Sequence, residues 1–142
     1  MTPTDTSIEF RRLRTFATLS PIPGFRDWLI ARDARWADID PAAPNAGMKK
    51  ELMALCARFL LQGKRDNEPA DSVARFHLAN GASLERLNWM ADASPAGRQR
   101  SFGIMANYLY RPEDLERNHE AYAREYRVIA SRPIERLVRL QD

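Results

Sequence analysis

An apolar segment that ends in a serine and runs straight into two prolines and a glycine constrains the fold more than any other feature. Residues 13–19 contain two threonines and a phenylalanine among leucines, which predicts a short buried strand. Pro21 and Pro23 lack backbone donors, and with Gly24 they predict a tight turn that leads into a helix. Ser20 is therefore expected at a junction between a strand and a helix.

The rest of the chain divides into helices and short strands separated by polar turns. Apolar residues recur at helical spacing over residues 48–61 with charges on the other side, and Gly63 marks the end of that helix. This pattern predicts an α+β fold with helices packed on a small sheet of about three strands. The other expected elements are helices over 25–36, 71–81, 113–126, 132–140 and from Pro95, strands over 83–92 and 103–110, and loops over 39–47 and 63–70.

The length and composition fit one globular domain over residues 1–142. A chain of 142 residues buries roughly 68–70% of its unfolded surface, which is enough for a core. Hydrophobic residues make up 44% and charged residues 29% of the chain, so disorder along its whole length is not expected. Residues 1–12 are expected to be frayed.

The charge pattern argues against a nucleic-acid partner. The net charge of +3 comes from 22 basic and 19 acidic residues, which are interspersed and give a mild bias toward anionic partners. A nucleic-acid protein would gather its basic residues on one face beside stacking aromatics. The nearest candidate, Arg11, Arg12 and Arg14, is as compatible with a solvated terminus.

The single cysteine and the lack of long apolar runs indicate in which cellular compartment the protein is expected. Cys56 has no partner for an intrachain disulfide and lies in an apolar row, so we expect a core residue in a reducing compartment. No stretch approaches the ~20 apolar residues of a membrane span, and the first residues lack the apolar run of a signal peptide. We therefore expect a cytoplasmic protein with no membrane contact.

Four sequence blocks, in this order, resemble malonyl-CoA decarboxylase. The resemblance covers most of the chain, and its most specific motifs are SPIPGF and HLANGA. It implies the acyl-CoA-binding fold shared with GNAT acetyltransferases, the conversion of malonyl-CoA to acetyl-CoA and carbon dioxide without a cofactor, and a role in fatty acid metabolism. The blocks are TFATLSPIPGF at 15–25, LMALCARFLL at 52–61, VARFHLANGASLERLNWMAD at 73–92, and MANYLY at 105–110.

The same resemblance assigns the site residues. The family's catalytic serine corresponds to Ser20 and its catalytic histidine to His77. Tyr110 ends the family's NYxY-type motif, and we expect Tyr110 and Asn107 from this motif to bind the substrate.

The residue types suit this chemistry. Loss of carbon dioxide leaves an enolate, which a preorganised hydroxyl donor such as Ser20 stabilises by ~3–4 kcal/mol. A histidine with a pKa near ~6.5 exchanges protons at neutral pH, so we expect His77 to donate the proton and Ser20 to orient the malonyl carboxylate. The structural alternatives are a strand-end serine and a histidine that interacts with a helix C-terminus.

Other Ser-His chemistry has less support. A nucleophilic serine of the hydrolase type would sit in a G-x-S-x-G elbow, which this chain lacks. Asp71 and Asp92 are possible orienting groups for His77, but each is expected to be a cap or turn residue. His119 lies in a charged helix and shares no ligand spacing with His77, so we predict no metal site.

Two parts known in the family have no counterpart in this sequence. Family members carry a helical N-terminal domain and an earlier half of the catalytic domain, whose glycine-bearing loop resembles a pyrophosphate-binding turn. The six glycines here do not cluster into such a loop, so the sequence shows no evident binding site for the CoA phosphates. The first strand should then expose an unpaired edge, and we expect a homo-oligomer or a partner chain that supplies the missing half-domain. The alternative function is a non-catalytic remnant or interaction module.

Overall fold

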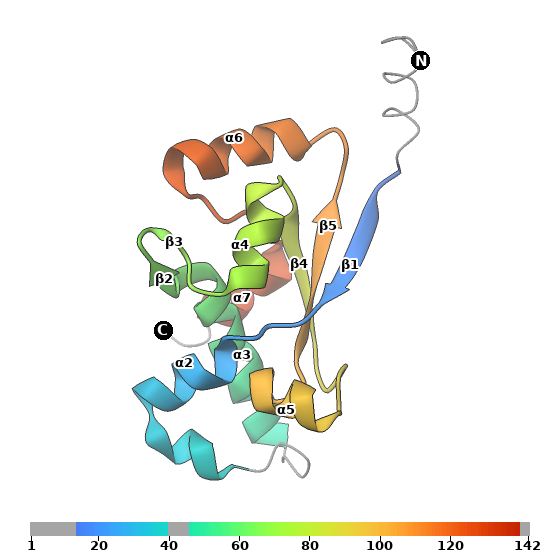
Figure 1. The fold of residues 1–142 in the computed structure, drawn as a ribbon. Coiled ribbons are helices and arrows are strands. Elements are labelled where there is room, and N and C mark those ends of the chain that lie inside the picture. The colour runs from blue at the N-terminus through green and yellow to red at the C-terminus, as the bar shows by residue number, and fades with distance from the viewer. Residues whose placement is uncertain (1–13, 40–45, 140–142) are drawn as a thin grey trace.

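The computed structural model describes residues 14–39 and 46–139, in which helices and strands alternate around one small sheet (Figure 1). The sheet is antiparallel and has three strands in the order β1-β5-β4. Its strands are β1 (Phe16–Ser20), β4 (Ser83–Asn88) and β5 (Met105–Tyr110). The predicted α+β class with about three strands is confirmed.

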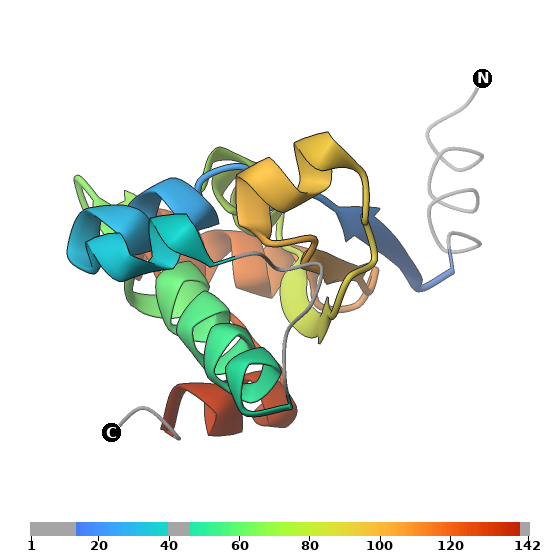
Figure 2. The same cartoon turned by 90° about the horizontal axis from the view of Figure 1, so that it is seen from below.

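Six α-helices, one 3₁₀ helix and a small hairpin complete the described part of the chain. Figure 2, which looks from below, shows α3 beside α7, with α2 and α5 on the other side of α3. These elements are α2 (Phe25–Arg32), η1 (Ala34–Asp38), α3 (Ala46–Gln62), β2 (Lys64–Arg65), β3 (Glu68–Pro69), α4 (Ser72–Ala79), α5 (Pro95–Ser101), α6 (Leu115–Glu125) and α7 (Arg132–Arg139).

The helix expected over residues 25–36 is divided at Asp33, so that prediction was wrong in its second half. Asp33 is extended, with φ −150° and ψ 98°, and its carboxylate accepts the backbone N–H of Arg35 at 3.2 Å. A short acidic side chain that bonds the backbone nearby competes with helix continuation. The chain therefore restarts as the 3₁₀ helix η1.

The loop expected over residues 63–70 contains the hairpin β2-β3, in which Lys64 pairs with Pro69. Its turn residues Asp66 and Asn67 both have positive φ, at 52° and 74°. Two such residues suit the turn that best matches the twist of antiparallel strands. Of the loop expected over 39–47, residues 40–45 lie outside the described part, and α3 already begins at Ala46.

Two helix starts are as predicted. Asp71 caps α4 by accepting the N–H of Ala74 at 2.9 Å, and Ser94 caps α5 by accepting the N–H of Gly97 at 3.1 Å. Pro95 occupies the first turn of α5, where its missing N–H costs nothing.

The core lies between one face of the sheet and the helices. Leu84, Ala106 and Tyr108 are fully buried on that face. Cys56 is also fully buried, which raises the pKa of its thiol and agrees with the expected core role. Other fully buried side chains in this core are Ile22, Phe25, Leu52, Leu60, Phe102, Ile104 and Ile134.

The two edges of the sheet differ. Beside β4, the N–H of Leu84 donates to the carbonyl of Ile129 at 2.8 Å, and the N–H of Ser131 donates to the carbonyl of Leu84 at 2.9 Å. β1 forms the other edge and pairs only with β5 among residues 14–39 and 46–139. The predicted open edge is thus present in the described part of the chain.

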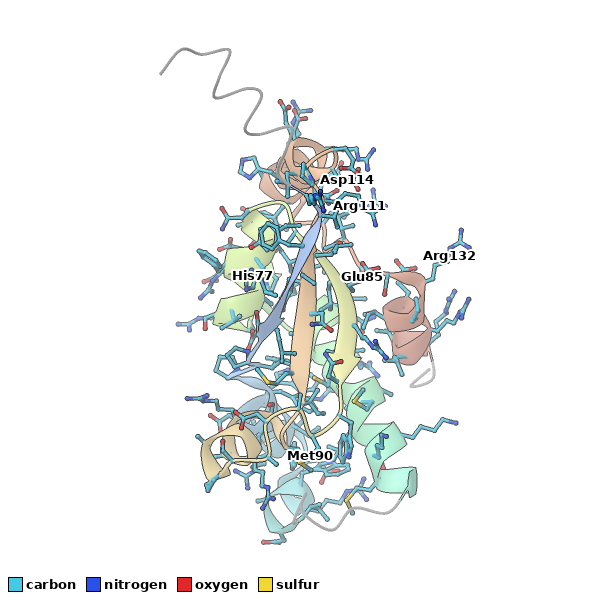
Figure 3. All side chains as sticks on the ribbon, turned by 90° about the vertical axis from the view of Figure 1, so that its right-hand side faces the viewer. His77, Glu85, Met90, Arg111, Asp114 and Arg132 are labelled. Carbon is cyan, nitrogen blue, oxygen red and sulfur yellow. The ribbon has the colours of Figure 1, made fainter. Side chains whose placement is uncertain are left out.

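The second face of the sheet is free of helices where Figure 3 views it. Strand alternation places Leu19, Asn107 and Leu109 on this face, and Leu19 is 55% exposed. Within the described residues, no helix is both long and apolar enough to cross a membrane.

Candidate active site

Ser20 is the last residue of β1, as expected from the proline turn that follows it. It pairs with Ala106 of β5, and the alternation of the strand turns its side chain toward the core face. The side chain is buried, and its Oγ lies 3.1 Å from Nε2 of His77. The hydroxyl of Thr18, on the same face of β1, lies 2.9 Å from the Ser20 hydroxyl.

His77 lies in the last turn of α4 and is contacted at both ring nitrogens. Nε2 meets Ser20, and Nδ1 lies 2.5 Å from the hydroxyl of Tyr110. Ser20 and Tyr110 are separated from His77 by 57 and 33 positions in the sequence. Three of the four predicted site residues therefore meet in one hydrogen-bonded row.

Aromatic rings surround this row. The ring of Tyr108 stacks on His77, with centroids 4.5 Å apart and planes 20° apart. Phe16 stacks on Tyr110 at 4.9 Å, and Phe76 beside His77 is 62% exposed. Sequence reasoning missed Thr18, Phe16 and Tyr108, although counting back in steps of two from Ser20 and Tyr110 would have placed all three on the site face.

Burial sets the charge state of the row. Loss of solvent lowers the pKa of His77 and raises the pKa of Tyr110. At neutral pH the imidazole is then uncharged with one N–H, and the tyrosine keeps its proton. If Tyr110 donates to Nδ1, Nε2–H donates to Ser20 and frees the serine proton for a third group. In the other tautomer both directions reverse.

Asn107, the fourth predicted site residue, lies on the opposite face of β5. Its Nδ2 donates to the carbonyl of Thr18 at 3.0 Å, and its Oδ1 accepts from Nδ2 of Asn88 at 2.8 Å. These bonds tie the three strands together. The structure does not bring Asn107 together with Ser20, His77 and Tyr110.

The other titratable candidates have separate partners. Asp71 accepts from backbone N–H groups, and Asp92 accepts from the backbone and hydroxyl of Ser94. Nδ1 of His119 lies 2.6 Å from the carbonyl of Ala79. None of these bonds reaches His77. Among the described residues, no group of three His, Cys, Asp or Glu side chains could hold a metal ion, and the predicted absence of a metal stays a prediction.

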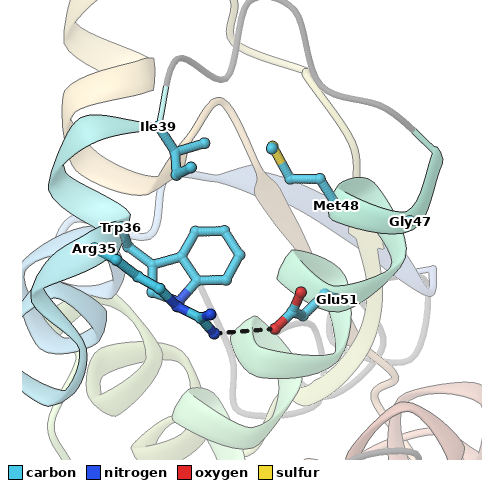
Figure 4. A pocket seen from close by; sticks show the side chains of 6 residues that line it. All are labelled: Arg35, Trp36, Ile39, Gly47, Met48 and Glu51. Atoms are coloured by element: carbon cyan, nitrogen blue, oxygen red, sulfur yellow. Dashed lines mark ion pairs between the residues drawn. The ribbon is translucent and has the colours of Figure 1, made fainter.

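A pocket of about 440 Å³ lies apart from this row (Figure 4). Arg35 and Glu51 face each other across it at 4.0 Å, and both side chains are largely exposed. Trp36, Ile39, Gly47 and Met48 form the rest of its wall. It includes no predicted site residue.

Comparison with known proteins decides the family. Residues 30–142 match the family model described as Malonyl-CoA decarboxylase C-terminal domain. The chain belongs to the malonyl-CoA decarboxylase family. The match includes His77 and Tyr110 and begins after Ser20.

Individual relatives of the malonyl-CoA decarboxylase family agree with this assignment. The mitochondrial malonyl-CoA decarboxylase of Mus musculus is 32% identical over 92% of this chain, and that of Anser anser anser is 33% identical over 78%. The chain spans only 34% and 29% of these two proteins.

Solved structures of the same family have a similar fold. The malonyl-CoA decarboxylase from Agrobacterium vitis has a TM-score of 0.79 and 37% identity, with 94% of this chain and 39% of that one covered. The enzyme from Cupriavidus metallidurans has a TM-score of 0.76 and 36% identity, with 95% of this chain and 41% of that one covered. The resemblance stated from the sequence is therefore confirmed at the level of the family.

Proposed function

We propose that this chain carries the acyl-end chemistry of malonyl-CoA decarboxylation, as a carbon-carbon lyase that forms acetyl-CoA and carbon dioxide. The observation that carries the proposal is the hydrogen-bonded row Ser20–His77–Tyr110, assembled from two strands and a helix. It occurs in a chain of the malonyl-CoA decarboxylase family. A GNAT-like acyl-CoA-binding fold is part of the same proposal.

The reaction breaks the bond between the α carbon and the carboxylate. The electron pair of that bond moves into the thioester and leaves an enolate, and one proton must then reach the α carbon. In our proposal the Ser20 hydroxyl donates to the malonyl carboxylate and orients it. A preorganised donor of this kind contributes ~3–4 kcal/mol to transition-state stabilisation.

His77 supplies the proton in this proposal. Burial favours the neutral ring in the free protein, but a malonyl carboxylate bound beside Ser20 would favour the charged imidazolium. The imidazolium then protonates the α carbon and is recharged from solvent. Because burial raises the pKa of Tyr110, this phenol keeps its own proton and orients the ring.

The decisive experiment follows acetyl-CoA by mass spectrometry after incubation with malonyl-CoA. Ser20→Ala and His77→Ala should each lower the rate by about 10²-fold or more, as expected for loss of a donor or a general acid. Ser72→Ala is the matched control, since Ser72 is exposed on the helix that carries His77. Equal rates in all four proteins would remove both residues from the mechanism.

The pH dependence gives a second test. If a protonated His77 is required, kcat should fall on the alkaline side of its pKa in the complex. Because the pKa of His77 is lowered in the free protein, kcat/KM should begin to fall at a lower pH than kcat. A kcat/KM that rises through this range would instead assign a neutral His77 to the reaction.

A non-catalytic remnant or interaction module is the second candidate function. The open edge of β1 favours it, because a partner chain or a second copy could pair there. The six glycines of this sequence also do not cluster into a loop suited to CoA phosphates. Absence of acetyl-CoA from the wild-type incubation would favour this candidate.

Location stays a prediction. The sequence favours the cytoplasm, whereas the relatives from Anser anser anser and Mus musculus are mitochondrial malonyl-CoA decarboxylases.

A further inference from the structure

One buried carboxylate joins the segment after Ser20 to the helix that carries His77. Oδ1 of Asp71 accepts the N–H of Gly24 at 3.1 Å, and Oδ2 accepts the N–H of Ala74 at 2.9 Å. Gly24 is the N-cap residue of α2, and Asp71 is the N-cap residue of α4. A single anionic group thus lies at the N-terminal ends of two helices, where the helix dipoles favour negative charge.

A helix cap requires neither the burial of Asp71 nor its second hydrogen bond to another helix. Ser94 caps α5 with an exposed hydroxyl, whereas Asp71 is only 1% exposed. Burial raises the pKa of Asp71, and the N–H bonds from Ala74 and Gly24 act in the opposite direction. A buried carboxylate is destabilising unless it is hydrogen-bonded, so both oxygens need their partners.

The bonds of Asp71 reach both halves of the candidate site over short, stiff paths. On one side, Gly24 is four positions after Ser20, and Pro21 and Pro23 restrict the backbone between them. On the other side, Asp71 and His77 belong to the same helix, α4, and its cap. The Ser20 to His77 distance of 3.1 Å leaves little room for displacement before the hydrogen bond is lost.

We propose that Asp71 is a positioning residue that holds the Ser20 segment in place against His77. It does so by bonding both helix ends with one carboxylate, without contact to the substrate. The proposal rests on the proposed function for its kinetic consequence, but its geometric consequence is measurable without activity.

The test compares three substitutions at this position. Asp71→Ser keeps one short oxygen that can still cap α4, but it cannot also reach Gly24. Asp71→Ala removes both bonds, and Asp71→Asn keeps the size of the side chain with a single acceptor oxygen. Ser94→Ala is the matched control, because it removes a cap from α5, away from the site.

Two readouts are followed in a His119→Gln background, which leaves His77 as the only histidine. The first is kcat and KM with malonyl-CoA. The second is the NMR titration of the His77 ring. Asp71→Ser and Asp71→Ala should lower kcat by about tenfold to 10²-fold, as expected for misplaced groups, with KM nearly unchanged. Both should also move the titration midpoint of His77 upward, as its surroundings open to water.

The possible outcomes distinguish a positioning role of Asp71 from a simple helix cap, and they distinguish failure of this proposal from failure of the proposed function. If Asp71→Ser resembles wild type in both readouts and only Asp71→Ala departs, Asp71 is a simple cap and the proposal is overturned. If wild type forms no acetyl-CoA, the proposed function fails, and an unchanged His77 titration in Asp71→Ser would still overturn the positioning role. If Asp71→Ser and Asp71→Ala do not fold, Asp71→Asn decides, with an upward shift supporting the proposal and no shift overturning it. Ser94→Ala should leave both readouts unchanged.

Discussion

The Tyr110 hydroxyl and the Ser20 hydroxyl contact opposite nitrogens of the His77 ring, at 2.5 Å and 3.1 Å. The ring is therefore held at both ends, and the group at Nδ1 influences which proton Nε2 presents to Ser20. With Tyr108 stacked on its face, the imidazole has a defined plane as well as a defined direction.

Tyr110→Phe tests the contact at Nδ1. The substitution removes the hydroxyl and keeps a ring for the stack with Phe16. One lost hydrogen bond corresponds to about 1 kcal/mol, so the rate of acetyl-CoA formation should fall by roughly five- to tenfold. Nitrogen NMR shifts of His77 should show a changed tautomer balance. Tyr126→Phe, at a partly exposed tyrosine outside the row, is the control, and equal rates in the two variants would contradict a role for Tyr110.

The lowered pKa of His77 predicts a pH-dependent stability. Since the unfolded chain has the ordinary value near ~6.5, it binds the histidine proton at a higher pH than the folded chain does. This contribution to the free energy of unfolding is present above ~6.5 and is lost as the pH falls through the lower folded value. Urea unfolding at several pH values should show that the free energy of unfolding decreases less at acid pH in His77→Gln than in wild type. A His77→Gln curve parallel to wild type would count against the shift.

Asn107 is expected to contribute to stability more than to catalysis. Asn107→Ala removes the bonds to Thr18 and Asn88 and should lower the free energy of unfolding by about 1–2 kcal/mol. Asn88→Ala provides a comparison, because it also breaks the Asn88–Asn107 bond but leaves the Asn107 bond to Thr18. The His77 titration should be the same in both. A fall in kcat at unchanged stability would instead support the substrate contact predicted from the sequence.

The open edge of β1 predicts self-association. Leu19 is 55% exposed on the helix-free face, beside the edge of β1 that pairs with no other strand within residues 14–39 and 46–139. Leu19→Lys should reduce association, because a charge on an edge strand opposes pairing with another chain. Size-exclusion chromatography with light scattering measures this, and Tyr126→Lys, on the C-cap of α6, is the matched control. A wild-type protein that is monomeric at all concentrations would contradict the prediction.

Local signals allowed most of the elements to be predicted. The proline turn after Ser20, the cap at Asp71 and the Ser94-Pro95 helix start depend on neighbouring residues alone, and the structure has all three. The interruption at Asp33 was missed because the apolar spacing continues through it. The β2-β3 hairpin was missed because its strands have only two residues each and no alternating apolar pattern.

The site was only partly accessible from the sequence. Motif likeness selected Ser20, His77 and Tyr110, but it grouped Asn107 with them because adjacent letters of one motif do not reveal which face of a strand each occupies. The partners of Asp71 were not accessible either, because Gly24 lies 47 positions away and its N–H is provided by the fold.

The alternation of β5 has a consequence for how this segment can vary. Tyr108 and Tyr110 contact His77 on the core face of the sheet, while Asn107 and Leu109 lie on the opposite face. Consecutive residues of this strand therefore point to opposite faces. Deleting one residue before Asn107 would reverse both sides at once, because Leu109 and Arg111 would take the positions of Tyr108 and Tyr110 beside the imidazole. Changes of length in this strand are therefore compatible with the site only in steps of two residues, whereas single substitutions disturb one side and leave the other intact.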